Sequence, residues 1–129
     1  MNPRVVVALL AGAVAGCTGE SSAPDPGALS VILETTTGPA VGAIVVTISG
    51  GPVIGVHGGA NLDASHTTDG SGVHVLIVGD VGIGVVATLD VPDTRAADAY
   101  VVTIDQVASD STFALLDPAP FRARIVAPQ

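Results

Sequence analysis

The chain has 129 residues and a formal net charge of −8, with 12 acidic residues against four basic ones, all of them arginine. Because binding to phosphates requires clustered lysine and arginine, this balance argues against a nucleic acid partner. A chain of this length forms at most one domain. Valine and threonine are frequent while aromatic residues are few, which favours strands over helices.

The first 16 residues have the organisation of a secretory signal peptide. Arg4 supplies the positive start, and a short apolar run continues from Val5 to Gly16. A membrane-spanning helix needs about 20 apolar residues, so this run is too short for an ordinary transmembrane anchor. We therefore expect residues 1–16 to be removed on export.

The segment Val14-Ala15-Gly16-Cys17 contains the single cysteine of the chain and resembles a bacterial lipobox. The resemblance implies cleavage between Gly16 and Cys17, and diacylglycerol on the Cys17 sulfur. The alternative is that Cys17 is a small buried residue. Because each buried methylene contributes about 0.8 kcal/mol, several acyl chains would anchor the protein firmly. In lipoproteins of bacteria with two membranes, an Asp directly after the lipidated cysteine resembles a signal for retention in the inner membrane. Thr18 occupies this position here, which favours the outer membrane or cell surface. We therefore expect a lipid-anchored protein of the cell envelope.

Residues 17–27 are predicted to form a flexible tether after the lipidated cysteine. They are rich in serine, proline and glycine and have no apolar periodicity. The domain itself is expected over residues 28–129.

Short apolar runs with period-two alternation fill this domain and are separated by glycine-rich turns. Residues 93–98 are expected to form a single helical turn, and residues 57–72 a long loop with a short edge strand at 65–68. The gap at 79–82 is typical of a hairpin connection. The main strands are expected at residues 29–36, 43–49, 53–56, 73–78, 84–91, 99–108 and 121–127.

Seven to eight short strands in about 100 residues predict an all-β domain, an antiparallel β-sandwich of immunoglobulin-like or cohesin-like type. A small closed barrel is the alternative. The runs Gly42–Pro52, Val73–Gly79 and Gly84–Pro92 resemble the strand patterns of cohesin-like and related carbohydrate-binding sandwich domains. The resemblance implies binding to a protein partner through one face of a sheet, and it implies no particular contact residue.

Three histidines, His57, His66 and His74, lie near Asp63 and Asp69 in the sequence. Their spacing fits no zinc signature, so we expect exposed or hydrogen-bonded histidines and no metal site. The run Asp69-Gly70-Ser71-Gly72 lacks the alternating oxygen ligands of a calcium loop, and a plain turn is expected there instead.

Catalytic motifs are not evident. The sequence has no Gly-x-Ser-x-Gly elbow, and Asp110-Ser111-Thr112 is typical of a turn. We therefore expect no enzyme activity and no cofactor. Sugar-binding domains usually expose tryptophan or tyrosine rings. Here Tyr100 is expected to be a core residue or the anchor at the end of a strand, and the other aromatic residues are Phe113 and Phe121.

Two functions stay open on the sequence. The first is a membrane-tethered, non-catalytic interaction or structural module, for which residues 57–72 would be the contact surface because function concentrates on loops. The second is a module that binds a glycan or a metal ion.

Overall fold

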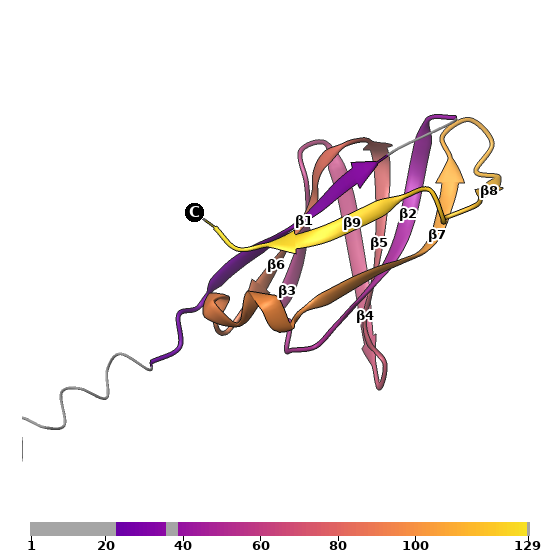
Figure 1. Ribbon diagram of the computed structural model, residues 1–129. Helices are drawn as coiled ribbons and strands as arrows, with labels where there is room; N and C mark the ends of the chain where they lie inside the picture. The colour runs from indigo at the N-terminus through magenta and orange to yellow at the C-terminus, as the bar shows by residue number, and fades with distance from the viewer. Residues whose placement is uncertain (1–22, 36–38, 129) are drawn as a thin grey trace, which may run out of the picture.

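The strands form two antiparallel sheets packed face to face, which makes the domain a β-sandwich (Figure 1). The computed structural model describes residues 23–35 and 39–128. Gly16 and Cys17, with the predicted signal peptide and lipidation site, lie outside the described residues. One sheet has the order β3 (Gly55–Gly58), β6 (Gly84–Val91), β1 (Gly27–Thr35), β9 (Arg122–Val126). The other has the order β4 (Leu62–Asp69), β5 (Gly72–Val81), β2 (Val41–Ser49), β7 (Val101–Ser109), β8 (Leu115–Leu116).

The core lies between the sheets and follows the predicted alternation. Each central strand turns every second residue inward, because successive side chains of a strand point to opposite faces. In the strands predicted at 29–36, 43–49 and 73–78, one of the two alternating sets of apolar residues is buried throughout. These residues are Leu29, Val31, Leu33, Ile44, Val46, Ile48, Val73, Val75 and Ile77.

The long loop predicted over residues 57–72 is wrong. Most of this segment belongs to β3 and β4, which are joined by a short turn, and only residues 70–71 separate β4 from β5. β4 is an edge strand paired along its whole length with β5. Its sequence is polar because both of its faces are largely exposed, so it lacks the apolar alternation that marks a strand. The predicted edge strand at 65–68 is the middle of β4.

The connection between β5 and β6 is shorter than predicted. β5 continues to Val81, so the turn consists of Gly82 and Ile83 and not of residues 79–82. The ladder with β2 shifts register between Val41 and Ala43, and Gly79 adopts a φ of +141° opposite this shift. β8, two residues long, was not predicted.

A 3₁₀ helix, η3 (Thr94–Ala99), links β6 to β7 and agrees with the predicted helical turn. Asp93 caps it by accepting a hydrogen bond from the backbone N–H of Arg95. The Thr94 N–H donates to the Asp25 carbonyl at 2.8 Å, and the Asp25 N–H donates to the Asp93 carboxylate at 3.2 Å. The chain is therefore held to the sandwich from Asp25, two residues before β1. None of the described residues belongs to a helix with the length and hydropathy of a membrane span.

Candidate functional site

The outer face of the five-stranded sheet carries the most distinctive arrangement of side chains. Residues that face each other across neighbouring strands form rows on this face. The row nearest β8 contains Asp63, Val78, Ala43, Ala108 and Leu115. The next row contains Ser65, Leu76, Val45 and Gln106, and the third contains Thr67, His74, Thr47 and Thr103. The face thus changes from apolar to polar along the strands.

The apolar end of this face is uncovered in the described part of the chain. Leu76 is 41% exposed, Val78 37% and Leu115 69%. A groove of about 160 Å³ lies beside Leu76 and Leu115, and Val45 and Ala108 also line it. We call the set Ala43, Val45, Leu76, Val78, Ala108 and Leu115 the apolar strip. Contiguous exposed apolar surface rimmed by polar residues is typical of a protein contact.

The polar end holds a chain of hydrogen bonds that crosses β7, β2 and β5. The Thr47 hydroxyl donates to Oδ2 of Asp105 at 2.5 Å and lies 3.0 Å from Nδ1 of His74. On the other side of the ring, Nε2 of His74 lies 2.9 Å from Oδ2 of Asp69. Ser71 joins the same cluster, with its hydroxyl 2.7 Å from Asp69. A fixed polar network therefore borders the apolar strip.

Both ring nitrogens of His74 have partners in this network. Nδ1 lies beside Thr47, and Nε2 lies 2.9 Å from Asp69 and 3.2 Å from the Ser71 hydroxyl. The ring therefore links β2 to the turn between β4 and β5.

The turn between β4 and β5 fixes the acidic end of the network. Asp69 accepts hydrogen bonds from both the hydroxyl and the backbone N–H of Ser71, and Gly72 follows with a φ of +132°. The predicted plain turn is thus confirmed as an Asx-type turn. The Ser71 hydroxyl, then its backbone N–H and then His74 lower the pKa of Asp69 to about 2.

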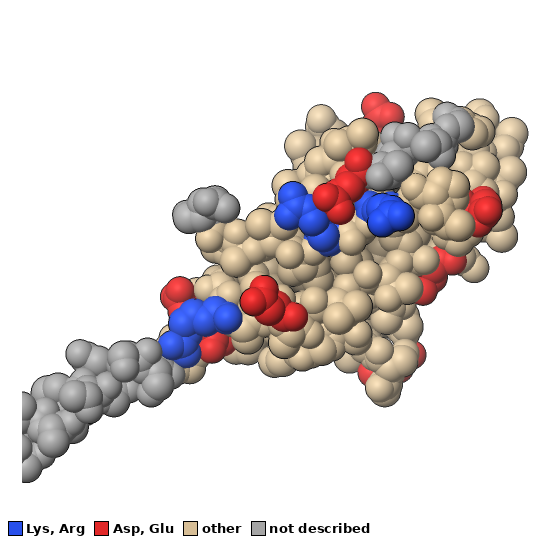
Figure 2. Space-filling view, viewed as in Figure 1, with Lys and Arg blue, Asp and Glu red and all other residues tan. Residues whose placement is uncertain are grey.

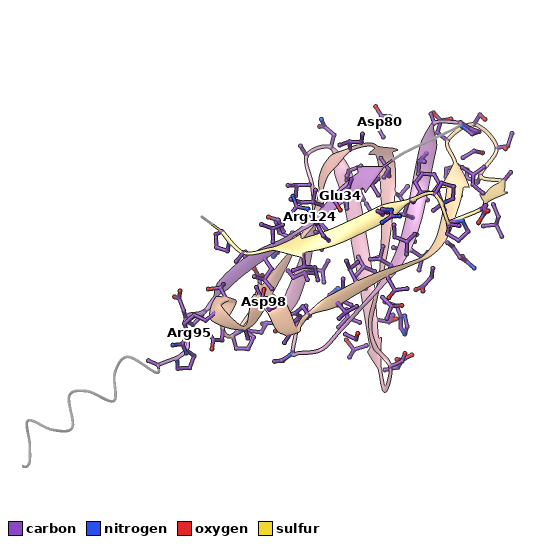
Figure 3. The ribbon with its side chains drawn as sticks, viewed as in Figure 1. Glu34, Asp80, Arg95, Asp98 and Arg124 are labelled. Atoms are coloured by element: carbon purple, nitrogen blue, oxygen red, sulfur yellow. The ribbon has the colours of Figure 1, made fainter. Side chains whose placement is uncertain are left out.

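Charge is distributed unequally between the two sheets. The strands of the five-stranded sheet contain four aspartates and no lysine or arginine. Arg95 lies in η3, and Arg122 and Arg124 lie in β9 of the other sheet. Figure 2 shows separate basic groups on the face that β1 and β9 cross, each near acidic groups. Figure 3 shows Arg124 beside Glu34, which it contacts at 2.8 Å. The site face is therefore acidic at its rim.

The three histidines are not brought together. His57 lies on the other sheet and pairs with Asp90, with Nε2 and Oδ2 2.8 Å apart, whereas His66 is an exposed residue of β4. Within residues 23–35 and 39–128, no group of three or more His, Cys, Asp or Glu side chains could hold a metal ion. Only His74 belongs to the site. Tyr100 is buried at the start of β7 and its hydroxyl donates to the Pro52 carbonyl at 2.6 Å, as expected of a strand-end anchor.

Thr47 and Asp105 were not singled out from the sequence. β7 contains a bulge, since Val46 faces Ile104 but Val45 faces Gln106, which leaves Asp105 as the extra residue. The inward positions thus change from Val102 and Ile104 to Val107 and Ser109. A polar Gln106 followed by an apolar Val107, where strict alternation requires the reverse, is the signal that indicates this bulge.

No known protein family, curated protein or solved structure matches the chain.

Proposed function

We propose that this protein is a membrane-tethered interaction module that binds a partner protein through the outer face of the five-stranded sheet. The observation that carries the proposal is the apolar strip, bordered on one side by the Thr47–His74–Asp69 network and rimmed by aspartates. The resemblance to cohesin-like domains, which bind a partner through one sheet face, supports the same surface. It replaces the loop over residues 57–72 as the proposed contact.

The chemistry of this face supports one kind of partner. Leu76, Val78 and Leu115 offer apolar area, and Asp63 and Asp105 lie at opposite edges of the face with no lysine or arginine on its strands. Complementary charge steers association and excludes wrong partners. The partner we propose therefore presents an apolar patch rimmed by lysine or arginine. A second copy of this acidic chain would place like charges together.

The tether is proposed from the sequence. A lipid on Cys17 would hold the domain at a membrane surface, and the domain begins at Asp25, where the chain contacts η3. The seven residues between these positions span at most about 25 Å when extended. The partner would accordingly lie in the same membrane or in the layer immediately beside it. The intact mass of the protein from membranes, compared with that of Cys17→Ser, tests this part independently.

Site-specific photo-crosslinking in cells tests the interaction. A photo-reactive residue in place of Leu76 is expected to join the full chain to one defined protein. Leu76→Asp, combined with a photo-reactive residue at Leu115, should remove this product, because it puts a charge into the centre of the apolar strip.

Val85→Asp is the matched control. Val85 is 46% exposed, close to the 41% of Leu76, but it lies on the four-stranded sheet. Val85→Asp should leave the crosslink unchanged. The face is not the binding surface if both variants weaken the product equally, or if neither does while both remain folded.

The second candidate function is binding of a small ligand, a glycan or a metal ion, and the polar network is the feature that favours it. A depression of about 270 Å³ beside His74 and His66 is the place where such a ligand would sit. A ligand that binds only the folded state raises its thermal stability. A thermal shift with a glycan, calcium or zinc that disappears in Thr47→Val would favour this function over the first.

A further inference from the structure

The edge of the five-stranded sheet formed by β7 is open along most of its length. β8 pairs only with Val107 and Ala108. Within the described residues, no strand pairs with the outer side of β7 from Val101 to Gln106. Alternate residues of an antiparallel strand direct their N–H and C=O groups to each side, so this run presents unpaired backbone groups at the edge.

A cleft of about 480 Å³ lies directly beside this open edge, between β7 and β9. Its apolar floor includes Val102 and Ile104, which are partly buried, and Phe121, which is 7% exposed. Pro118 and Ala119 border it from the turn before β9. The two sheets are thus not fully closed against each other at this side of the sandwich. The volume is within the range of about 300–1,000 Å³ typical of ligand sites.

We propose that β7 accepts an extended segment of a partner polypeptide as an added strand, with alternate apolar side chains of that segment entering the cleft. Backbone pairing with β7 supplies hydrogen bonds, and the pockets for every second side chain supply selectivity. The Asp105 bulge interrupts the edge, because bulges disrupt ladder pairing. The added strand therefore pairs with about five residues of β7, beginning at Val101.

Charge on the outer face of the five-stranded sheet favours basic outward side chains in the segment. An added strand would extend this face, whose strands contain four aspartates, Asp105 among them, and no lysine or arginine. Asp105 lies at the end of the open run, so lysine or arginine is favoured between the apolar residues of the segment. This charge disfavours a second copy of the chain, whose net charge is also −8.

Amide hydrogen exchange of the full-length chain, purified in detergent micelles, tests the proposal. The probe is the peptide Lys-Val-Lys-Val-Lys-Val, and its control is Lys-Lys-Lys-Val-Val-Val, which has the same composition and charge but no alternation. The alternating peptide is expected to slow exchange of the amides within 101–105 at least about tenfold, equivalent to about 1.4 kcal/mol. The control peptide should not slow their exchange.

Two matched variants locate the effect. Ala119→Trp places a bulky ring at the mouth of the cleft and should abolish protection by the alternating peptide. Ala114→Trp changes a second exposed alanine that does not line the cleft, and it should behave as wild type. Leu76→Asp should also behave as wild type, which separates this site from the sheet face of the proposed function.

Three results would overturn the proposal. The first is equal protection by both peptides, because charge alone would then explain binding. The second is unchanged protection in Ala119→Trp. The third is protection of the amides of residues 101–105 in the absence of peptide, if this protection increases with protein concentration. Such a result would show that a second copy covers the edge.

Discussion

Thr47 and Asp105, which are 58 positions apart in sequence, share a hydrogen bond of 2.5 Å on the outer face of the sandwich. This length is within the range of a hydroxyl donating to a carboxylate. Because Thr47 also lies 3.0 Å from Nδ1 of His74, the side chains of three neighbouring strands are joined beside the apolar strip. The bond gives the polar border of the proposed binding face one fixed geometry.

Thr47→Val should destabilise the domain by about 1 kcal/mol, because it removes the hydroxyl that links Asp105 to His74. Valine keeps the shape and the strand preference of threonine, so packing changes little. Urea denaturation of the variant and wild type measures the difference in free energy of unfolding.

Thr103→Val is the matched control for Thr47→Val. Thr103 faces Thr47 directly across β2 and β7. Its substitution should leave the free energy of unfolding within about 0.5 kcal/mol of wild type. Equal losses in the two variants would show that the network contributes nothing beyond strand preference.

The fold was predictable where apolar alternation is strict, and it was not where edges and bulges break the pattern. Leu29, Val31 and Leu33 identify their strand because β1 lies between β6 and β9 and packs one face against the core. β4 was placed mostly in a loop, since an edge strand exposed on both faces needs no apolar residues. The candidate site was harder to predict than the fold. Asp105 contacts Thr47 only because β7 contains a bulge. The contact also requires β7 to lie beside β2, and the sequence does not determine the strand order.

Asp69 should titrate at about pH 2, well below its usual 3.8, because Ser71 and His74 stabilise its charged form. A carboxyl whose pKa is lowered by folding contributes stability above its unfolded pKa. That contribution is lost as the pH falls from about 4 through 2. Carboxyl ¹³C chemical shifts in an acid titration measure the midpoint.

Ser71→Ala should move the Asp69 midpoint upward, because the Ser71 hydroxyl is the largest cause of the lowered pKa. The Ser71 backbone N–H remains, so the midpoint should stay below 3.8. Ser65→Ala removes a hydroxyl of the same sheet face that is not bonded to Asp69, and it should not move the midpoint. An unchanged midpoint in Ser71→Ala would contradict the role of the turn.

Tyr100 should make the domain sensitive to alkaline pH. Burial, with a smaller effect of the Asp93 charge, raises the pKa of Tyr100 above its usual 10. The folded state therefore favours the neutral phenol. The contribution of Tyr100 to the free energy of unfolding is fully present below pH 10, and it is lost as the pH rises through the pKa of the folded state. Absorbance of the phenolate reports this group alone, because the chain has one tyrosine.

Tyr100→Phe separates the pH effect from the hydrogen bond. The free energy of unfolding of the variant should be about 1–2 kcal/mol lower at neutral pH. The reason is that the Pro52 carbonyl loses the hydrogen bond of 2.6 Å that the Tyr100 hydroxyl donates to it. Between pH 9 and 11 it should then lose less further stability than wild type, since it has no phenol to ionise. Parallel stability curves over this range would contradict the assignment.

Gly50→Ala should be among the most damaging single substitutions in the loop that covers Tyr100. Gly50 has a φ of +99°, and an added Cβ would lie 1.9 Å from the Ala99 carbonyl oxygen. The backbone strain alone costs about 1–3 kcal/mol, and the contact with a backbone atom can be relieved only by moving the start of β7. Gly82→Ala is the control, because nothing lies within 4 Å of an added Cβ there and its φ is not in the positive range. The urea midpoint should fall sharply for Gly50→Ala and stay near that of wild type for Gly82→Ala. Equal midpoints for the two variants would show that the loop before β3 does not hold the start of β7 in place.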